Sequence, residues 1–362
     1  MKAGRIGRLG RRLLRRPAHR EPEPSTRIAP DLSAVVTTPR WVAEMAEPVT
    51  TTRPIDPHSD MVSVVIPSYN HGRFVAHAIR SVAHQTYRNI EIVVVDDGST
   101  DDSAKVIERT LNESDWAKAT FVRQDNAGAH NALNRALELC SGRYIGILNS
   151  DDAYHPQRIE RLHGVCATGG FPFAFSQIAF SELAVPPSDG IDHGAEQYQI
   201  WHDQLSRYPS LGFSLVRLNG TWTSSNFFFT RDLLDRIGAF RDFVLVNDWD
   251  FVLRAVVDSE PALLAEQLLY YRRHENNTYV REGTVEAAHR EFSRVLASYF
   301  ESVRYGVTGN PLAPSQANWP DYFPSFLAAD SQLALHPAFD SLIDIWKSTD
   351  RAPAEPPERV PT

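Results

Sequence analysis

Two adjacent carboxylates, Asp151 and Asp152, follow an apolar run in the stretch RYIGILNSDDAYHP, residues 143–156. Like charges side by side repel each other, so such a pair needs a nearby cation or several hydrogen-bond donors. Mg²⁺ commonly takes one or two protein carboxylates together with phosphate oxygens of a substrate. The pair therefore indicates Mg²⁺ or Mn²⁺ with a nucleoside diphosphate, and it disfavours a bare phosphate.

Two other apolar runs end in the same way. The run VSVVIP (62–67) is followed by Ser68, Tyr69 and Asn70, and IEIVVVDD (90–97) closes on two aspartates. Ligands of open α/β sheets bind beyond the carboxyl ends of the strands, so three such endings predict one site. Taken singly, each ending could be a turn or a helix cap. The phosphate-binding pattern GxxxxGK does not occur, which disfavours an ATPase of that type.

Short buried strands alternate with helices through the first part of the chain. This alternation predicts an α/β fold with a mainly parallel central sheet and right-handed crossovers. The expected strands are 62–67, 90–97, 120–124 and 143–149, and the expected helices are 74–82, one from Thr100, 129–140 and one from Pro156. After about residue 170 the pattern loosens to a strand and helix over 224–240, a helix from Asn247, a strand within 263–274 and a helix over 284–305.

The composition is that of a soluble globular protein. The 362 residues are 42% hydrophobic and 23% charged, and the apolar runs are far shorter than a membrane-spanning helix requires. We expect no secretory signal, and we expect Cys140 and Cys166 to be reduced thiols, so the sequence predicts a cytoplasmic protein.

The charge is unevenly distributed. Residues 1–20 hold eight Lys and Arg, which leaves 29 basic and 45 acidic residues in the rest of the chain. This acidic body disfavours nucleic acid as a partner. In RIGRLGRRLLRR the arginines gather on one helical face, typical of a helix on an anionic membrane surface, although Gly7 and Gly10 leave a solvated tail as an alternative. Peripheral contact with the inner face of a membrane is one hypothesis for this segment.

The stretches VSVVIPSYNHGRFVAHAIRSVAHQTYRNIEIVVVDDGSTDDS and NAGAHNALNRALELCSGRYIGILNSDDAYHP resemble family 2 of the inverting glycosyltransferases, which have the GT-A fold. The resemblance covers roughly 61–165 and continues more weakly to about 280. It implies a nucleotide-sugar-binding half over 61–165 and an acceptor-binding half over 166–282. We expect a flexible basic and Pro-rich segment over 1–60, a helical extension over 283–350 and a disordered tail over 351–362.

The resemblance also implies roles for residues of the first half. Pro67, Tyr69 and Asn70 would line the nucleotide pocket, Asp96 would accept hydrogen bonds from the base, and Asp151 would face the ribose. Asp152 would hold the metal ion, Mg²⁺ or Mn²⁺. Asn149 stands where many members of the family have an aspartate.

The second half would supply the base and the diphosphate site. In NDWDF, Asp248 is the expected catalytic base, which takes the proton of the acceptor hydroxyl, and Asp250 is the reserve candidate. Trp249 would pack on a sugar ring or in the core. By the same resemblance, the basic segment contributes Arg272 and Arg273 to the departing diphosphate and His274 to the metal.

The expected function is metal-dependent transfer of a sugar, UDP-linked in the commonest case, to a glycan or lipid-linked acceptor in surface glycan or lipid-linked oligosaccharide biosynthesis. One alternative is a nucleotidyltransferase on a similar fold, but PSYNHGRF lacks the Gly-rich, basic loop typical of those enzymes. Another is a non-catalytic carbohydrate-binding relative, in which the paired carboxylates would be expected to have been lost.

Overall fold

The structure is a computed structural model that describes residues 60–114, 116, 118–181, 193–274, 277, 284–304 and 308–329. The basic segment 1–20 and the expected tail 351–362 lie outside the described residues. No helix in the described part of the chain is long and apolar enough to cross a membrane.

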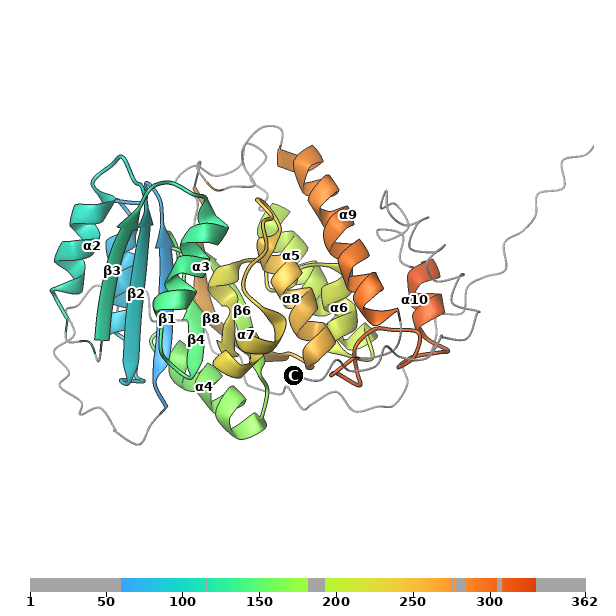
Figure 1. The fold of residues 1–362 in the computed structure, drawn as a ribbon. Helices are drawn as coiled ribbons and strands as arrows, with labels where there is room; N and C mark the ends of the chain where they lie inside the picture. Colours follow the sequence, from blue (N-terminus) through green and yellow to red (C-terminus); the bar gives the residue numbers. More distant parts are fainter. Residues whose placement is uncertain are drawn as a thin grey trace, which may run out of the picture.

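One sheet joins the two halves of the chain (Figure 1). Its strands are β1 (Val62–Ser68), β2 (Ile90–Asp97), β3 (Lys118–Gln124), β4 (Tyr144–Ile147), β5 (Ala153–Tyr154), β6 (Phe173–Ser181), β7 (Phe228–Thr230) and β8 (Ala262–Arg272). The helices are α1 (Val75–Ala83), α2 (Ser103–Leu111), α3 (Ala129–Leu139), α4 (Arg158–Gly169), α5 (His193–Asp203), α6 (Leu211–Arg217), α7 (Arg231–Ile237), α8 (Asn247–Asp258), α9 (Thr284–Val303) and α10 (Phe323–Ala329), with 3₁₀ turns η2 (Leu205–Arg207) and η3 (Ser224–Asn226).

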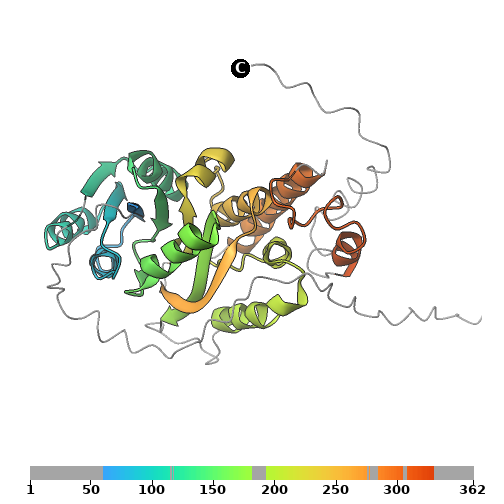
Figure 2. The same cartoon turned by 90° about the horizontal axis from the view of Figure 1, so that it is seen from below.

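The strand order is β3-β2-β1-β4-β7-β6-β8-β5. The first four of these strands are parallel, while β7 runs antiparallel to both β4 and β6, and β5 runs antiparallel to β8. The predicted α/β fold is therefore confirmed, with a parallel first half and a mixed second half. All eight residues of β2 are buried, because helices cover both faces of the parallel half (Figures 1 and 2).

Several expected boundaries differ from the structure. The helix expected from Thr100 begins at Ser103, and Asp101 precedes it, accepting hydrogen bonds from the backbone N–H of Ser103 at 2.9 Å and of Gly72 at 3.0 Å. The helix expected at Pro156 begins two residues later. Strand β4 ends at Ile147, because the N–H of Asn149 donates to the Ser225 hydroxyl instead of to a neighbouring strand.

The C-terminal helices complete the core on the side of α8. Helix α9 packs along α8, and α10 brings Phe323 and Phe326 against Phe213 of α6 (Figure 1). Helix α6 packs on α8 in turn, so these helices support the first turn of α8, which carries Asp248.

Candidate active site

Four segments meet at the carboxyl edge of the parallel strands. They are the loop after β1, the end of β2, residues 149–152 after β4 and residues 272–274 at the end of β8. Asn70 ties two of them together, because its N–H donates to Ser99 Oγ at 2.8 Å and its side-chain oxygen accepts from Thr100 N at 2.8 Å. Asn70 has φ +53°, which asparagine tolerates better than most residues. Asn70 therefore shapes the loop expected to line a nucleotide pocket.

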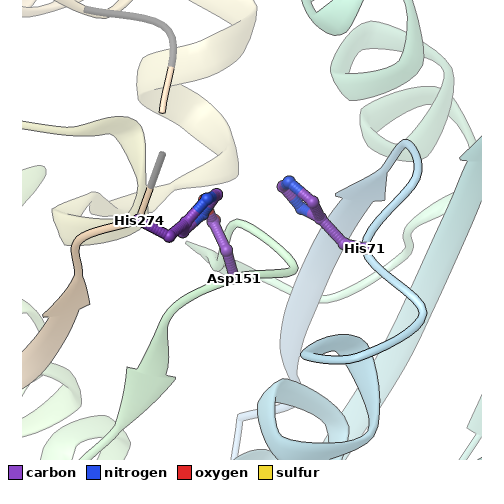
Figure 3. A group of neighbouring side chains, drawn as sticks. All are labelled: His71, Asp151 and His274. Atoms are coloured by element: carbon purple, nitrogen blue, oxygen red, sulfur yellow. The ribbon is translucent and has the colours of Figure 1, made fainter. Parts of the chain in front are cut away.

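His71, Asp151 and His274 form a cluster that could hold a metal ion (Figure 3). Their ligand atoms lie within 4.8 Å of one another, and His274 Nε2 is 3.0 Å from Asp151 Oδ2. The three side chains reach the cluster from the ends of three different strands. His71 is also fixed by a 2.8 Å contact between its Nδ1 and Ser150 Oγ.

The protonation states of Asp151 and His71 favour binding of a cation. Burial opposes ionisation of Asp151, but the hydrogen bond from His274 and the nearby His71 hold the pKa of Asp151 below its usual value. Burial lowers the pKa of His71, which favours the neutral imidazole that binds metals. The cluster thus offers one carboxylate and two imidazoles.

Asp152, the expected metal ligand, lies outside this cluster. Its side chain is buried, Oδ2 accepts a 2.5 Å hydrogen bond from Ser225 Oγ, and Oδ1 accepts one of 2.9 Å from the N–H of Arg272. Burial and the neighbouring Asp151 raise the pKa of Asp152. Because both oxygens face protein donors, Asp152 connects η3 to β8, whereas Asp151, expected at the ribose, takes the place beside His274.

Asn149 donates a hydrogen bond that an aspartate could not donate. Its side-chain N–H₂ donates to Thr223 Oγ1 at 3.0 Å, and its oxygen accepts from Ser224 Oγ at 3.1 Å. A carboxylate has no donor for Thr223. The amide therefore attaches the end of β4 to the segment before β7.

Cationic and imidazole groups surround the ring of Phe74. The guanidinium carbons of Arg73 and Arg272 lie 4.4 and 5.1 Å from the ring centroid, and the His274 and His71 rings lie 4.7 and 5.9 Å away. The ring therefore brings together two guanidinium groups from distant segments of the chain, and a diphosphate could use their charge.

Arg272 and Arg273, which were both expected at the diphosphate, have different surroundings. Arg272 Nε donates to the carbonyl oxygen of Asp151 at 2.8 Å, and its Nη2 lies 2.5 Å from His77 Nδ1. The Arg273 guanidinium instead lies 5.4 Å from the centroid of Phe180. Successive side chains of an extended segment point to opposite faces, so Arg272 points toward the cluster and Arg273 points toward Phe180.

Asp96 carries an unused acceptor. Its side chain is fully buried, and Oδ2 lies 3.2 Å from the N–H of Ser99 and 3.3 Å from Arg123 Nε. Oδ1 has no hydrogen-bond partner among the described residues. A buried acceptor without a partner is costly, so it indicates an N–H group of a ligand. Near this acceptor, Pro67 pairs with Val95 in the sheet, and Tyr69 is 44% exposed and open to a planar ligand.

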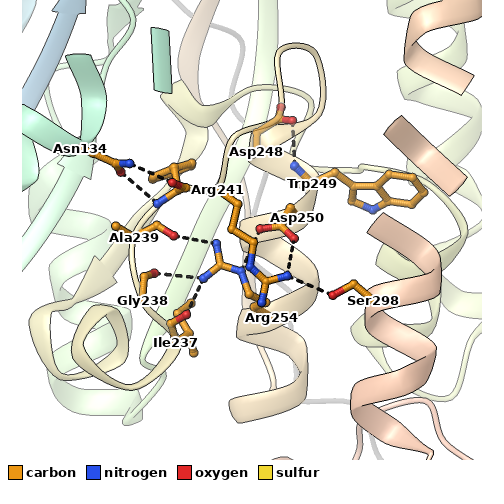
Figure 4. A network of polar contacts seen from close by, with 11 residues as sticks. Asn134, Ile237, Gly238, Ala239, Arg241, Asp248, Trp249, Asp250, Arg254 and Ser298 are labelled. Carbon is orange, nitrogen blue, oxygen red and sulfur yellow. Dashed lines mark hydrogen bonds and ion pairs between the residues drawn. The ribbon is translucent and has the colours of Figure 1, made fainter. Parts of the chain in front are cut away.

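Asp248 lies in the first turn of α8. Its Oδ2 accepts a hydrogen bond of 3.1 Å from Asn219 Nδ2, and Oδ1 accepts one of 2.7 Å from the N–H of Trp249 (Figure 4). Burial raises the pKa of Asp248 to about 6. A carboxylate with that pKa is ionised at neutral pH yet basic enough to accept a proton.

Asp250, the reserve candidate, is engaged elsewhere. It is buried and forms ion pairs with Arg254 at 2.9 Å and Arg241 at 3.3 Å (Figure 4). Arg254 in turn donates to the carbonyl oxygens of Gly238 and Ala239. Asp250 therefore fixes the turn between α7 and α8.

Trp249 belongs to the core. It is 5% exposed, its Nε1 donates to the carbonyl oxygen of Leu215 at 2.7 Å, and its ring meets Phe292 edge-on. Of the two interpretations open from the sequence, the structure selects the core one.

Sequence reasoning missed His71, Arg73 and Asn219. His71 and Arg73 stand directly after the polar ending of β1, a position that could have singled them out. Asn219 gave no signal, because it reaches Asp248 across 29 residues only through the packing of the loop after α6 against α8.

Residues 63–184 match the model of glycosyl transferase family 2. This region of the chain is therefore similar to that family. The family region thus covers every element from β1 to β6, including Asp96 and Asp151, while Asp248 and His274 lie beyond it.

Curated glycosyltransferases match this chain over part of their length. An uncharacterized glycosyltransferase of Nostoc sp. is 29% identical over 225 residues, 60% of this chain and 66% of that protein. The glycosyltransferase GlyG of Streptococcus pneumoniae is 37% identical over 106 residues, 29% of this chain and 35% of that protein. The chain therefore spans about two thirds or less of the length of these relatives.

Solved glycosyltransferase structures share the fold. Staphylococcus aureus TarS 1–349 in complex with UDP has a TM-score of 0.53 at 17% identity, covering 78% of this chain and 75% of that one. The mannosyltransferase PcManGT of Pyrobaculum calidifontis, in complex with GDP-Man and Mn²⁺, has a TM-score of 0.52 at 18% identity, covering 84% and 80%. At this identity the likeness establishes the expected GT-A fold and no more.

Proposed function

We propose that this chain is a metal-dependent inverting glycosyltransferase that moves a sugar from a nucleotide-diphosphate sugar to an acceptor hydroxyl. The observation that carries the proposal is the His71–Asp151–His274 cluster, which lies at the same sheet edge as the unpaired Asp96 Oδ1. A nucleoside diphosphate requires a metal ion beside its diphosphate and a hydrogen-bond acceptor beside its nucleobase. The TarS and PcManGT structures, which bind UDP and GDP-Man, support the same ligand class.

The metal is assigned to Asp151, His274 and His71, in place of the Asp152 expected from the sequence. One carboxylate and two imidazoles fit Mn²⁺ better than Mg²⁺, since Mg²⁺ favours oxygen ligands. When bound, the ion neutralises charge on the diphosphate. Arg272 and Arg73 beside Phe74 add positive charge for the departing nucleotide, and Arg273 is left out of this role.

Asp96 is assigned to the nucleobase and Tyr69 to the rim of its pocket. The free Oδ1 of Asp96 would accept an N–H, such as N3–H of uracil, and the ring of Tyr69 would cover the base. UDP is therefore the first donor class to test, with GDP, which also offers a ring N–H, as the second.

Asp248 is assigned as the catalytic base. The acceptor hydroxyl gives its proton to the Asp248 carboxylate as its oxygen forms a bond to the anomeric carbon of the donor sugar. The bond from that carbon to the diphosphate oxygen breaks, and its electron pair leaves with the nucleoside diphosphate, which inverts the anomeric configuration. Asn219 holds the carboxylate in place during this transfer.

Thermal-shift measurements with UDP, GDP, dTDP and CDP, each with and without Mn²⁺, test the donor site. A nucleotide that binds the native state raises its melting temperature. We expect one of these nucleotides to stabilise the protein only with Mn²⁺, and Asp151→Asn to lose this shift. Asp235→Asn, an exposed carboxylate on α7, is the matched control and should retain it. A folded wild-type protein that none of the four nucleotides shifts would contradict the proposal.

We place the reaction at a membrane surface, with a glycan or lipid-linked acceptor, because of the eight basic residues in 1–20. Flotation with vesicles that contain anionic lipid tests this placement. Loss of binding on deletion of residues 1–20 would support it, and unchanged binding would refute it.

A further inference from the structure

Trp222 has an unusual backbone conformation close to the proposed base. Its φ is +69°, a region that bulky side chains rarely adopt, and Asn70 is the one other described non-glycine residue with positive φ. Such a conformation costs about 1–3 kcal/mol and persists where the surroundings impose it, often at functional sites. The indole is half-buried, so part of its surface remains accessible.

The loop that carries Trp222 is connected to Asp248. The N–H of Trp222 donates to the carbonyl oxygen of Asn219 at 3.1 Å, and the side chain of Asn219 donates to Asp248 Oδ2 at 3.1 Å. The same side chain accepts a 2.5 Å hydrogen bond from Thr221 Oγ1. One asparagine therefore sets both the turn at Trp222 and the orientation of the base.

Aromatic contacts also link the indole of Trp222 to the segment that carries His274. The indole meets Phe180 and Tyr198 edge-on, with ring centroids 5.6 and 5.8 Å away. Phe180 in turn contacts Tyr271 and the guanidinium of Arg273, which immediately precedes His274. Trp222 thus stands on an aromatic cluster that adjoins both the base and the metal-binding segment.

We infer that Trp222 is a platform for the sugar ring of a saccharide acceptor, a step beyond the proposed function and resting on it. The C–H groups on one face of a pyranose form an apolar surface, and an indole offers a flat, rigid partner for that surface. A ring stacked there would hold a hydroxyl near Asp248. Trp249 is buried in the core, so its ring is not available for this role.

A glycan array probed with labelled protein, Mn²⁺ and the nucleotide found by thermal shift tests this inference. We expect the wild type to bind a set of saccharides and Trp222→Gly to bind them at least about tenfold more weakly. Glycine adopts positive φ freely, so this variant removes the indole while it keeps the backbone turn. Trp222→Phe should retain part of the binding.

The nucleotide shift distinguishes a failure of this inference from a failure of the proposed function. Trp222→Gly should keep the Mn²⁺-dependent nucleotide shift, which reports folding and the donor site. Equal saccharide binding by Trp222→Gly and the wild type would overturn the platform, and so would a wild type that binds nucleotide but no saccharide. Absence of the nucleotide shift in the wild type would instead overturn the proposed function itself.

Discussion

The carboxylate of Glu291 on α9 accepts a 2.8 Å hydrogen bond from the backbone N–H of Leu245, three residues before Asp248. The same side chain also accepts from the N–H groups of Val244 at 3.0 Å and Val246 at 3.3 Å. Arg294, one turn further along α9, covers Phe243 in the same loop. The C-terminal helix therefore holds the approach to α8, and with it the position of the proposed base.

We expect Glu291→Ala to slow sugar transfer by about tenfold and to lower the free energy of unfolding by about 1–3 kcal/mol, because three N–H groups lose their acceptor. Kinetics and urea unfolding measure the two effects. The nucleotide shift should be unchanged, since the donor site is built on other elements. Glu301→Ala is the control on the same helix, where the side chain contacts Arg304 at 3.6 Å. An active Glu291→Ala enzyme would show that the loop keeps its place without this contact.

Asp248→Asn should abolish transfer and leave nucleotide binding intact. It should also stabilise the protein at pH 8. The folded-state pKa of about 6 exceeds the unfolded value, so the wild type loses stability as pH rises from about 4 to above 6. Asparagine does not ionise, so its advantage should reach about 1–3 kcal/mol at pH 8 and vanish near pH 4.

Urea unfolding of the Asp248→Asn variant and the wild type across that pH range measures the difference. Asp235→Asn, which changes an exposed carboxylate on α7, is the control. A pH-independent difference for Asp248→Asn would mean that the carboxylate has an ordinary pKa in the folded protein, and retained transfer would place the base elsewhere.

Asp151 and Asp152 should respond differently to substitution. Asp151→Asn should lose Mn²⁺ binding with little change in stability. Asp152→Ala should lower the free energy of unfolding by about 1–3 kcal/mol, because the Ser225 hydroxyl and the Arg272 N–H lose their acceptors. Calorimetric Mn²⁺ titration and urea unfolding separate the two effects. Loss of Mn²⁺ binding in a stable Asp152→Asn variant, with Asp151→Asn unaffected, would reverse the assignment.

Asn149→Asp should destabilise the protein by about 1–2 kcal/mol at neutral pH, since a carboxylate cannot donate to Thr223 and adds charge beside two aspartates. A double-mutant cycle with Thr223→Val measures the contact. If Asn149→Asp costs as much in the Thr223→Val background as in the wild type, the Thr223 contact does not explain the asparagine.

The sequence predicted the parallel half of the sheet well. The continuous β-branched runs at β1 and β2 are typical of buried strands, and the helical period of residues 74–82 matches α1 within one residue. The second half was less predictable, because the short strand β7 and the turn η3 take their form from long-range contacts. The Ser225 hydroxyl donates to Asp152 and accepts from the backbone N–H of Asn149, and both hydrogen bonds span more than 70 residues.

The sequence by itself determined which kinds of residue gather at the sheet edge, because parallel strands must deliver their carboxyl ends to the same side. Only the tertiary structure decided which member of each pair lies at the candidate site: Asp151 or Asp152, Arg272 or Arg273, Asp248 or Asp250. Neighbouring side chains differ by a large rotation about the chain, and a one-residue uncertainty in where a strand or helix ends exchanges them. Distant partners such as Ser225, Phe180 and Arg254 remove that uncertainty, because each binds one member of a pair in a particular orientation.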